Sequence, residues 1–155
     1  MSATTTTDRI EKRILLRAPR ARVWRALADS AEFGKWFQVA FSAPFRAGAT
    51  LKGQLTIPGY QHLVMEITIE ELVPERRFSY RWHPHAVEPG ADYSGEPTTL
   101  VTFTLEEASG GTLLTIVEAG FDRLPVARRA EALRGNDGGW SMQVKAIQAY
   151  LEHDR

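Results

Sequence analysis

The sequence predicts an α+β fold in which an antiparallel sheet curls around one long C-terminal helix. Residues 99–106 alternate apolar and polar side chains, which is the period of a half-buried antiparallel strand. A second apolar run follows a turn at Gly110-Gly111. After Gly138-Gly139, apolar residues recur at spacings typical of a helix with one buried face: Trp140, Val144, Ile147 and Leu151. Because such a sheet and helix can enclose a cavity, the pattern favours a container for an apolar ligand.

The first part of the chain supplies one strand and two short helices. Residues 9–17 alternate around Ile10 and Ile14 and predict the first strand. Pro19 suits the first turn of the helix that follows, because its missing amide hydrogen needs no partner there. A second short helix is expected over residues 31–37, where it gathers Phe33, Trp36 and Phe37. The two helices are expected to close one end of the sheet.

The middle of the chain is strand and turn. Strands are expected over residues 41–45, 50–57, 62–73 and 77–83, which makes about six or seven strands in all. The adjoining Leu72 and Val73 predict a bulge or a strand end. Residues 83–97 contain three prolines and two glycines and predict a long loop that serves as a lid. A short helix capped by Gly135 is expected before the long one.

Composition and charge narrow the class of protein. A chain of 155 residues fits one domain, expected over residues 9–155 after a disordered tail at residues 1–8. Nineteen basic residues balance nineteen acidic ones, so nucleic acid is not expected as a partner. The absence of cysteine excludes disulfides and thiol catalysis. No apolar run approaches the roughly 20 residues of a membrane span. We therefore expect a cytoplasmic protein.

Several segments, in this order and spacing, resemble one known family. They are Ala18-Pro19, Val23-Trp24 and Leu27, Phe33 with Trp36-Phe37, residues 70–74, 78–82, 99–105 and 112–121, and Gly138-Gly139-Trp140 with Tyr150-Leu151. The family is the AHSA-like one, related to the activator of the heat-shock protein 90 ATPase, within the SRPBCC or START-like superfamily. The resemblance implies the helix-grip, or Bet v 1-like, fold. It also implies a domain that binds small molecules or proteins, with a chaperone among the partners to consider.

Aromatic residues are the main candidates for the walls of a ligand site. They are Trp36, Phe37, Tyr80, Trp82, Phe103 and Trp140, and Met65 and Val144 are expected to complete the walls. If they border a pocket for a drug-sized ligand, its volume should reach about 300 Å³ or more. The alternative is that the same rings fill a solid core.

Glu118 is the best polar candidate for the site. By resemblance, Leu114, Ile116 and Glu118 point inward, which would make the carboxylate a ligand anchor or proton acceptor among apolar walls. Leu113 and Val117 are also apolar, so the opposite register stays open, as does a carboxylate that pairs with an arginine or faces solvent.

His83 is expected at the rim of the pocket, where it would hydrogen-bond a ligand. Pro84 separates it from His85 and no third ligand stands at a suitable spacing, so no metal site is expected. Familiar catalytic and cofactor motifs are absent, so neither a catalytic residue nor a cofactor is assigned. The expected function is binding of a small hydrophobic or amphipathic ligand. An enzyme of the cyclase, aromatase or hydrolase kind and a chaperone-associated module are the alternatives, and the oligomeric state stays open.

Overall fold

The computed structural model describes residues 8–84 and 92–153. Its strands form one seven-stranded antiparallel sheet in the order β1-β7-β6-β5-β4-β3-β2. The strands are β1 (Arg9–Leu16), β2 (Val39–Phe41), β3 (Thr50–Leu55), β4 (Val64–Val73), β5 (Arg77–Trp82), β6 (Thr99–Ala108) and β7 (Gly111–Ala119). The helices are α1 (Arg20–Ala28), α2 (Ser30–Phe37) and α3 (Val126–His153), with a 3-10 turn, η1 (Phe121–Arg123), before α3.

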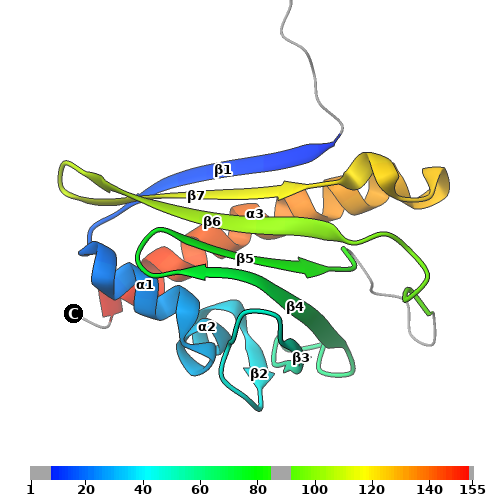
Figure 1. Cartoon of the computed structure of the whole chain (residues 1–155), viewed down its shortest axis with the longest axis horizontal. Coiled ribbons are helices and arrows are strands. Elements are labelled where there is room, and N and C mark those ends of the chain that lie inside the picture. Colours follow the sequence, from blue (N-terminus) through cyan, green and yellow to red (C-terminus); the bar gives the residue numbers. More distant parts are fainter. Residues whose placement is uncertain (1–7, 85–91, 154–155) are drawn as a thin grey trace, which may run out of the picture.

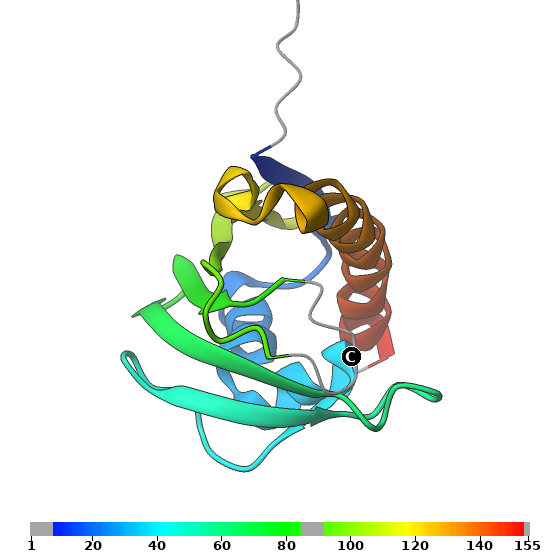
Figure 2. The same cartoon turned by 90° about the vertical axis from the view of Figure 1, so that its right-hand side faces the viewer.

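The sheet curls around α3, and α1 and α2 lie at one end of it (Figures 1 and 2). Helix α3 packs against the edge strand β1 and against α2. A curled antiparallel sheet that holds a long C-terminal helix is the helix-grip form of the α+β class. The predicted fold is therefore confirmed.

The register of β7 is the one that the family resemblance implied. Leu114, Ile116 and Glu118 are buried, whereas Leu113 and Val117 are only partly so. In the neighbouring strand Val101 lies opposite Glu118, and in the next strand Tyr80 lies opposite Val101. Because side chains alternate between the faces of a sheet, paired residues share a face. Tyr80, Val101 and Glu118 thus project together into the interior.

Helix α3 is continuous, so the predicted short helix capped by Gly135 is wrong. It runs for 28 residues through Gly135, Gly138 and Gly139. Glycine weakens a helix by roughly 0.5–1 kcal/mol relative to alanine, but tertiary contacts on both sides of this segment hold it helical. Ala132 is buried before the glycines and Trp140 after them.

Two further expectations need correction, and a third is confirmed. The strand expected over residues 41–45 is β2 at Val39–Phe41, because Gln38 takes a left-handed conformation (φ 67°) that ends α2 and starts the strand at once. The bulge or strand end expected at Leu72-Val73 is confirmed as a strand end, because β4 ends at Val73, and a separate irregularity in β4 lies between Ile69 and Glu71. The tail expected through residue 8 ends sooner, since the Asp8 carbonyl accepts hydrogen bonds from the Gly120 and Phe121 amides. The rest of that tail lies outside the described residues.

Phe33 lies at the centre of the aromatic core. Its side chain comes from α2 and is fully buried. Seven rings lie within centroid distances of 4.8–6.4 Å of it: Trp36, Phe37, Phe41, Phe45, Phe78, Tyr80 and Phe103. We call Phe33, Phe41, Phe45 and Phe78 the Phe33 core. It joins α2 to the sheet through apolar contacts.

Candidate functional site

Glu118 is the centre of a polar cluster inside the aromatic interior. Its side chain is fully buried. Oε2 accepts hydrogen bonds from Trp82 Nε1 (2.7 Å) and from Thr99 Oγ1 (2.5 Å). Oε1 accepts one from Trp140 Nε1 (2.8 Å), and Asn136 Nδ2 donates to both oxygens (2.9 and 3.1 Å). We call these five residues the Glu118 site.

Four elements bring these side chains together. Thr99 begins β6 directly opposite Trp82, the last residue of β5, and Glu118 lies near the end of β7. Asn136 and Trp140 are four residues apart on α3, so they share one helix face. The site therefore joins the ends of three neighbouring strands to the middle of α3.

The carboxylate of Glu118 is held by neutral donors. An indole N–H can only donate, and here two indoles, one amide and one hydroxyl all donate, so the carboxylate acts purely as an acceptor, as an ionised carboxylate does. Within residues 8–84 and 92–153, Glu118 forms no ion pair with a lysine, arginine or histidine. Of the two alternatives left open by the sequence, burial excludes a solvent-facing carboxylate, and no arginine of the described ranges pairs with Glu118.

A small hollow lies against this site. Its volume is about 70 Å³, and it is lined by Phe37, Trp82, Asn136, Gly139, Trp140 and Gln143. The three rings form a triangle, with centroid distances of 6.2 Å for Phe37–Trp82, 6.1 Å for Phe37–Trp140 and 6.0 Å for Trp82–Trp140. A Cβ atom built on Gly139 would meet no atom within 4 Å. The hollow thus has an aromatic wall and an unobstructed side at Gly139.

The hollow is smaller than the pocket of about 300 Å³ that a drug-sized ligand needs. The reason is ring packing, because Phe103 lies 5.8 Å from Trp140 and 6.1 Å from Tyr80, and Tyr80 lies 5.4 Å from Trp82, between centroids. A larger groove, of about 660 Å³, lies instead between β1 and the first half of α3. It is lined by Arg9, Ile10, Val126, Arg129, Ala130, Leu133, Arg134 and Asp137.

Tyr80 carries the other unusual polar group of the interior. The residue is fully buried, and its hydroxyl has no hydrogen-bond partner in the part of the chain that the structure describes. Burial raises the pKa of the phenol well above its usual value, and the charge of nearby Glu118 raises this pKa further. The hydroxyl therefore stays protonated and keeps a donor and an acceptor unused.

The structure gathers part of the predicted site and leaves part of it elsewhere. Phe37, Trp82 and Trp140 border the hollow with Glu118 behind them. The others of the predicted aromatic set, Trp36, Tyr80 and Phe103, are buried core residues. The Trp36 indole donates to the carbonyl of Ala26 (2.8 Å) and so ties α2 to α1.

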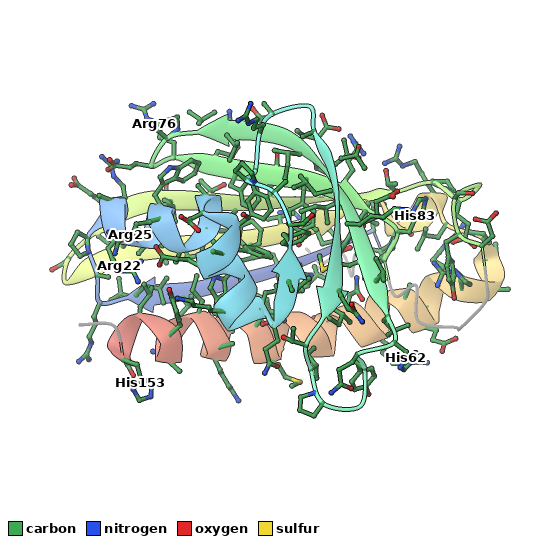
Figure 3. All side chains as sticks on the ribbon, turned by 90° about the horizontal axis from the view of Figure 1, so that it is seen from below. Arg22, Arg25, His62, Arg76, His83 and His153 are labelled. Carbon is green, nitrogen blue, oxygen red and sulfur yellow. The ribbon has the colours of Figure 1, made fainter. Side chains whose placement is uncertain are left out.

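Three predicted residues lie apart from the hollow. Met65 and Val144 are half-buried against the core and do not line it. His83 lies at the end of the molecule that holds the start of α3 (Figure 3), and its Nε2 is 3.0 Å from the carbonyl oxygen of Glu96. His83 does not line the hollow, so no contact supports the role expected for it at the rim. His85 lies outside the described residues.

The expected lid is described at its two ends. The Arg128 guanidinium pairs with Glu96 at 2.8 Å and donates to the carbonyl of Pro84 at 3.0 Å. It also lies 4.7 Å from the Tyr93 ring centroid. Arg128 thereby fastens both described ends of this loop to α3, and the stretch 85–91 lies outside the described residues.

Sequence reasoning missed four residues: Thr99, Asn136, Gly139 and Gln143. Asn136 had a detectable signal, because it precedes Trp140 by four positions and therefore interrupts an apolar helix face with an amide. The expected helix end at Gly135 concealed this spacing. Thr99 has the same parity as Val101 and Phe103, which placed it on the inward face of its strand.

Two other features are absent from the described residues. No cluster of three or more histidine, cysteine, aspartate or glutamate side chains in these ranges is arranged to hold a metal ion. Among the helices described, none combines the length and the apolar character needed to cross a membrane.

The curled sheet, the gripped helix and the aromatic interior define a helix-grip protein of the START-like class. Residues 17–152 match the family described as Activator of Hsp90 ATPase homolog 1-like protein. Because this match spans most of the chain, the protein belongs to that family. No curated protein matches the sequence.

Solved structures share the same fold. Protein MLL2253 from Mesorhizobium loti is similar over 95% of this chain and 98% of its own, with a TM-score of 0.75 and 19% identity. Protein CV1439 from Chromobacterium violaceum is similar over 93% and 96%, with a TM-score of 0.70 and 26% identity. DynU16, a protein of the dynemicin biosynthetic locus, has a TM-score of 0.73 and 24% identity over 96% of this chain. This chain covers 48% of DynU16, about half its length.

Proposed function

We propose that this protein binds a small amphipathic molecule at the hollow between α3 and the sheet. The observation that carries the proposal is the fully buried carboxylate of Glu118, which has no cationic partner in the described chain and lies directly behind a wall of Phe37, Trp82 and Trp140. Burial of a charge is costly even when it is hydrogen-bonded, and apolar side chains of similar volume often give a more stable core. Stability alone therefore does not account for this residue.

The dimensions of the hollow limit the ligand. A volume of about 70 Å³ admits a molecule of a few heavy atoms, or one end of a longer molecule. The longer part would leave past Gly139, where an added Cβ meets no atom within 4 Å. Burying the apolar part of such a ligand contributes about 25 cal/mol per Å², less the cost of association.

The family supports a binding role of this kind. Members of the START-like class share a sheet that wraps a helix, and binding sites for small molecules are typically concave and aromatic, with a few polar groups. The Glu118 site supplies those polar groups on the inner face of this chain.

A thermal-shift screen of small amphipathic compounds tests the proposal. A ligand that binds only the native state raises the melting temperature as its concentration rises. Gly139→Leu fills the hollow and should lose the response, whereas Gly138→Leu, at a helical glycine that does not line the hollow, should keep it. A response that is equal in both variants, or no response to any compound, would contradict the proposal.

A second candidate function rests on the family description, which names an activator of the Hsp90 ATPase. In that case the protein acts as a chaperone-associated module. Addition of the purified protein to an Hsp90-type ATPase should then raise the rate of ATP hydrolysis. An unchanged rate, with no association by calorimetry, would argue against this candidate.

A further inference from the structure

We propose that the hollow takes a small alkylammonium group, so that the ligand is an organic cation. This inference rests on the proposed function and names the charge of the molecule that the same site binds. It depends on three features: an uncompensated negative charge, an aromatic wall, and two amide oxygens that accept no hydrogen bond.

The negative charge lies immediately behind the hollow. Three of the residues that line the hollow, Trp82, Asn136 and Trp140, donate hydrogen bonds of 2.7–3.1 Å to Glu118. Only one layer of side chains therefore separates the carboxylate from a bound molecule. Because charges interact more strongly in a protein interior than in water, the potential of Glu118 is poorly screened in the hollow.

Arg134 and Lys145 are the cations of α3 that flank Asn136 and Trp140, and neither forms an ion pair with Glu118 within the described ranges. Two other cations at this helix are engaged with other carboxylates. Lys12 pairs with Asp137 at 2.9 Å, one residue beyond Asn136. Arg128 pairs with Glu96 at 2.8 Å and also binds the carbonyl of Pro84. Within the described ranges no lysine or arginine neutralises Glu118, so a ligand cation would supply the missing positive charge.

The aromatic wall is suited to the same charge. A cation is attracted to the face of an aromatic ring, most strongly to that of tryptophan. The indole N–H groups of Trp82 and Trp140 are directed at Glu118, so the remaining surface of these two rings is carbon and π density. Phe37 completes the wall at about the same spacing, 6.1–6.2 Å from each indole.

Two amide side chains at the hollow keep an unused acceptor. Asn136 donates through Nδ2 to Glu118, and Gln143 donates through Nε2 to the carbonyl of Phe37 (3.4 Å). The Oδ1 of Asn136 and the Oε1 of Gln143 accept no hydrogen bond from the described residues. An ammonium group carries only donors, so these oxygens match it, whereas a carboxylate ligand would meet Glu118 with a like charge.

Three probes of equal chain length test the charge of the ligand on the unaltered protein. Butylammonium, 1-butanol and butanoate differ mainly in charge, and the indole N–H resonances of Trp82 and Trp140 report binding in an NMR titration. We expect saturable shifts with butylammonium, with an affinity at least about tenfold above that of 1-butanol, and no saturation with butanoate.

Variants locate the effect. Glu118→Gln keeps the size of the side chain and removes its charge, so it should erase the preference for butylammonium over 1-butanol. Gly139→Leu should abolish the binding of both, and Gly138→Leu should leave both affinities as in the parent protein. Circular dichroism checks that each variant is folded. If Glu118→Gln does not fold, the affinities of the three probes for the parent protein still decide whether the ligand is a cation.

The outcomes separate this inference from the function on which it rests. Equal affinity for butylammonium and 1-butanol, abolished by Gly139→Leu, would overturn the cation assignment and leave the small-ligand function standing. A preference for butylammonium that survives Glu118→Gln would also overturn it, since the charge would then come from elsewhere. If no probe binds while another compound raises the melting temperature, the cation assignment fails alone. If neither screen finds a ligand, both fail.

Discussion

The Phe33 core and the Glu118 site lie under the same curled sheet but are built from different chemistry. The Phe33 core consists of four phenylalanines with no polar atom in their side chains, three of them buried. The Glu118 site has a buried carboxylate, four neutral donors and a hollow beside it. The two regions meet at Tyr80 and Phe103, whose rings contact both Phe33 and the tryptophans of the site.

The difference shows what each region contributes. Burial of apolar rings away from water stabilises the folded state, so the contribution to stability is enough to explain the residues of the Phe33 core. At the Glu118 site, a buried charge and an unfilled volume offset part of this stabilisation. A protein selected only for a solid interior would not need either, which is why the proposed ligand lies at the Glu118 site and the Phe33 core is assigned to folding stability.

Phe33→Ala should have the largest effect and defines one side of the comparison. Removal of this ring opens a cavity among the seven rings around it and should lower the free energy of unfolding by about 3–5 kcal/mol, measured by urea denaturation. Tyr60, which is 52% exposed, serves as control, and its replacement by alanine should change the free energy by less than about 0.5 kcal/mol. A loss below about 1 kcal/mol at Phe33 would show that this core is not where stability resides.

Glu118→Gln should lower the free energy of unfolding by less than Phe33→Ala does. The amide NH₂ group would face indole N–H donors that need an acceptor, and an unsatisfied buried donor costs about 1–3 kcal/mol. The same urea experiment measures it, with Glu66→Gln as the matched surface control, since the Glu66 side chain is 51% exposed and pairs loosely with Lys52 at 3.9 Å. A variant more stable than the parent protein would mean that the hydrogen bonds of Glu118 do not compensate for the free energy that burial of its carboxylate costs.

Tyr80→Phe should change stability in a way that depends on pH. Because the pKa of Tyr80 is raised in the folded protein, the unfolded chain loses this proton first, above a pH of about 10, and unfolding is then favoured. The parent protein should therefore lose stability between about pH 9.5 and pH 11 more steeply than Tyr80→Phe does. At pH 7 the variant should be as stable as the parent or slightly more so, because the hydroxyl has no partner to lose. Parallel pH profiles would contradict the raised pKa.

Gly138→Ala and Gly139→Ala should have the smallest effects. Both glycines lie inside α3, and an added Cβ meets no atom within 4 Å at either. Alanine should raise the free energy of unfolding by about 0.5–1 kcal/mol at each position. A melting experiment that found stabilisation at Gly138 and destabilisation at Gly139 would show that the wall of the hollow cannot accept even one methyl group.

Local patterns predicted most of the fold. The alternation along β6, the apolar run of β7, the helix face from Trp140 to Leu151 and the two short helices were all visible in neighbouring residues. The boundaries were less predictable. Gly135 resembled a helix cap because local propensity says nothing of the contacts that carry α3 through its glycines.

The site was predictable in its residue types and not in its arrangement. Trp82, Glu118 and Trp140 were identified as candidates, and the structure joins them through hydrogen bonds. Thr99 was missed because a single polar residue in an apolar pattern has no distinguishing mark until its partner is known. Asn136 was missed because the expected helix end at Gly135 separated it from the apolar face that it shares with Trp140. The volume of the hollow could not be predicted from the sequence either, since it depends on how side chains from distant segments pack together.

The sequence by itself determined the period of β6 and of the helix face from Trp140 to Leu151, and hence which of their side chains face inward, because that information lies in residues two to four positions apart. The inward face of β7 followed from the family resemblance, since Leu113 and Val117 left its period ambiguous. Only the tertiary structure decided that Glu118 is met by donors from β5, β6 and α3, and that the rings leave a hollow of about 70 Å³ where a larger cavity was expected. The physical reason is that cross-strand pairing and ring packing are set by contacts between residues far apart in the chain, and no local period encodes them.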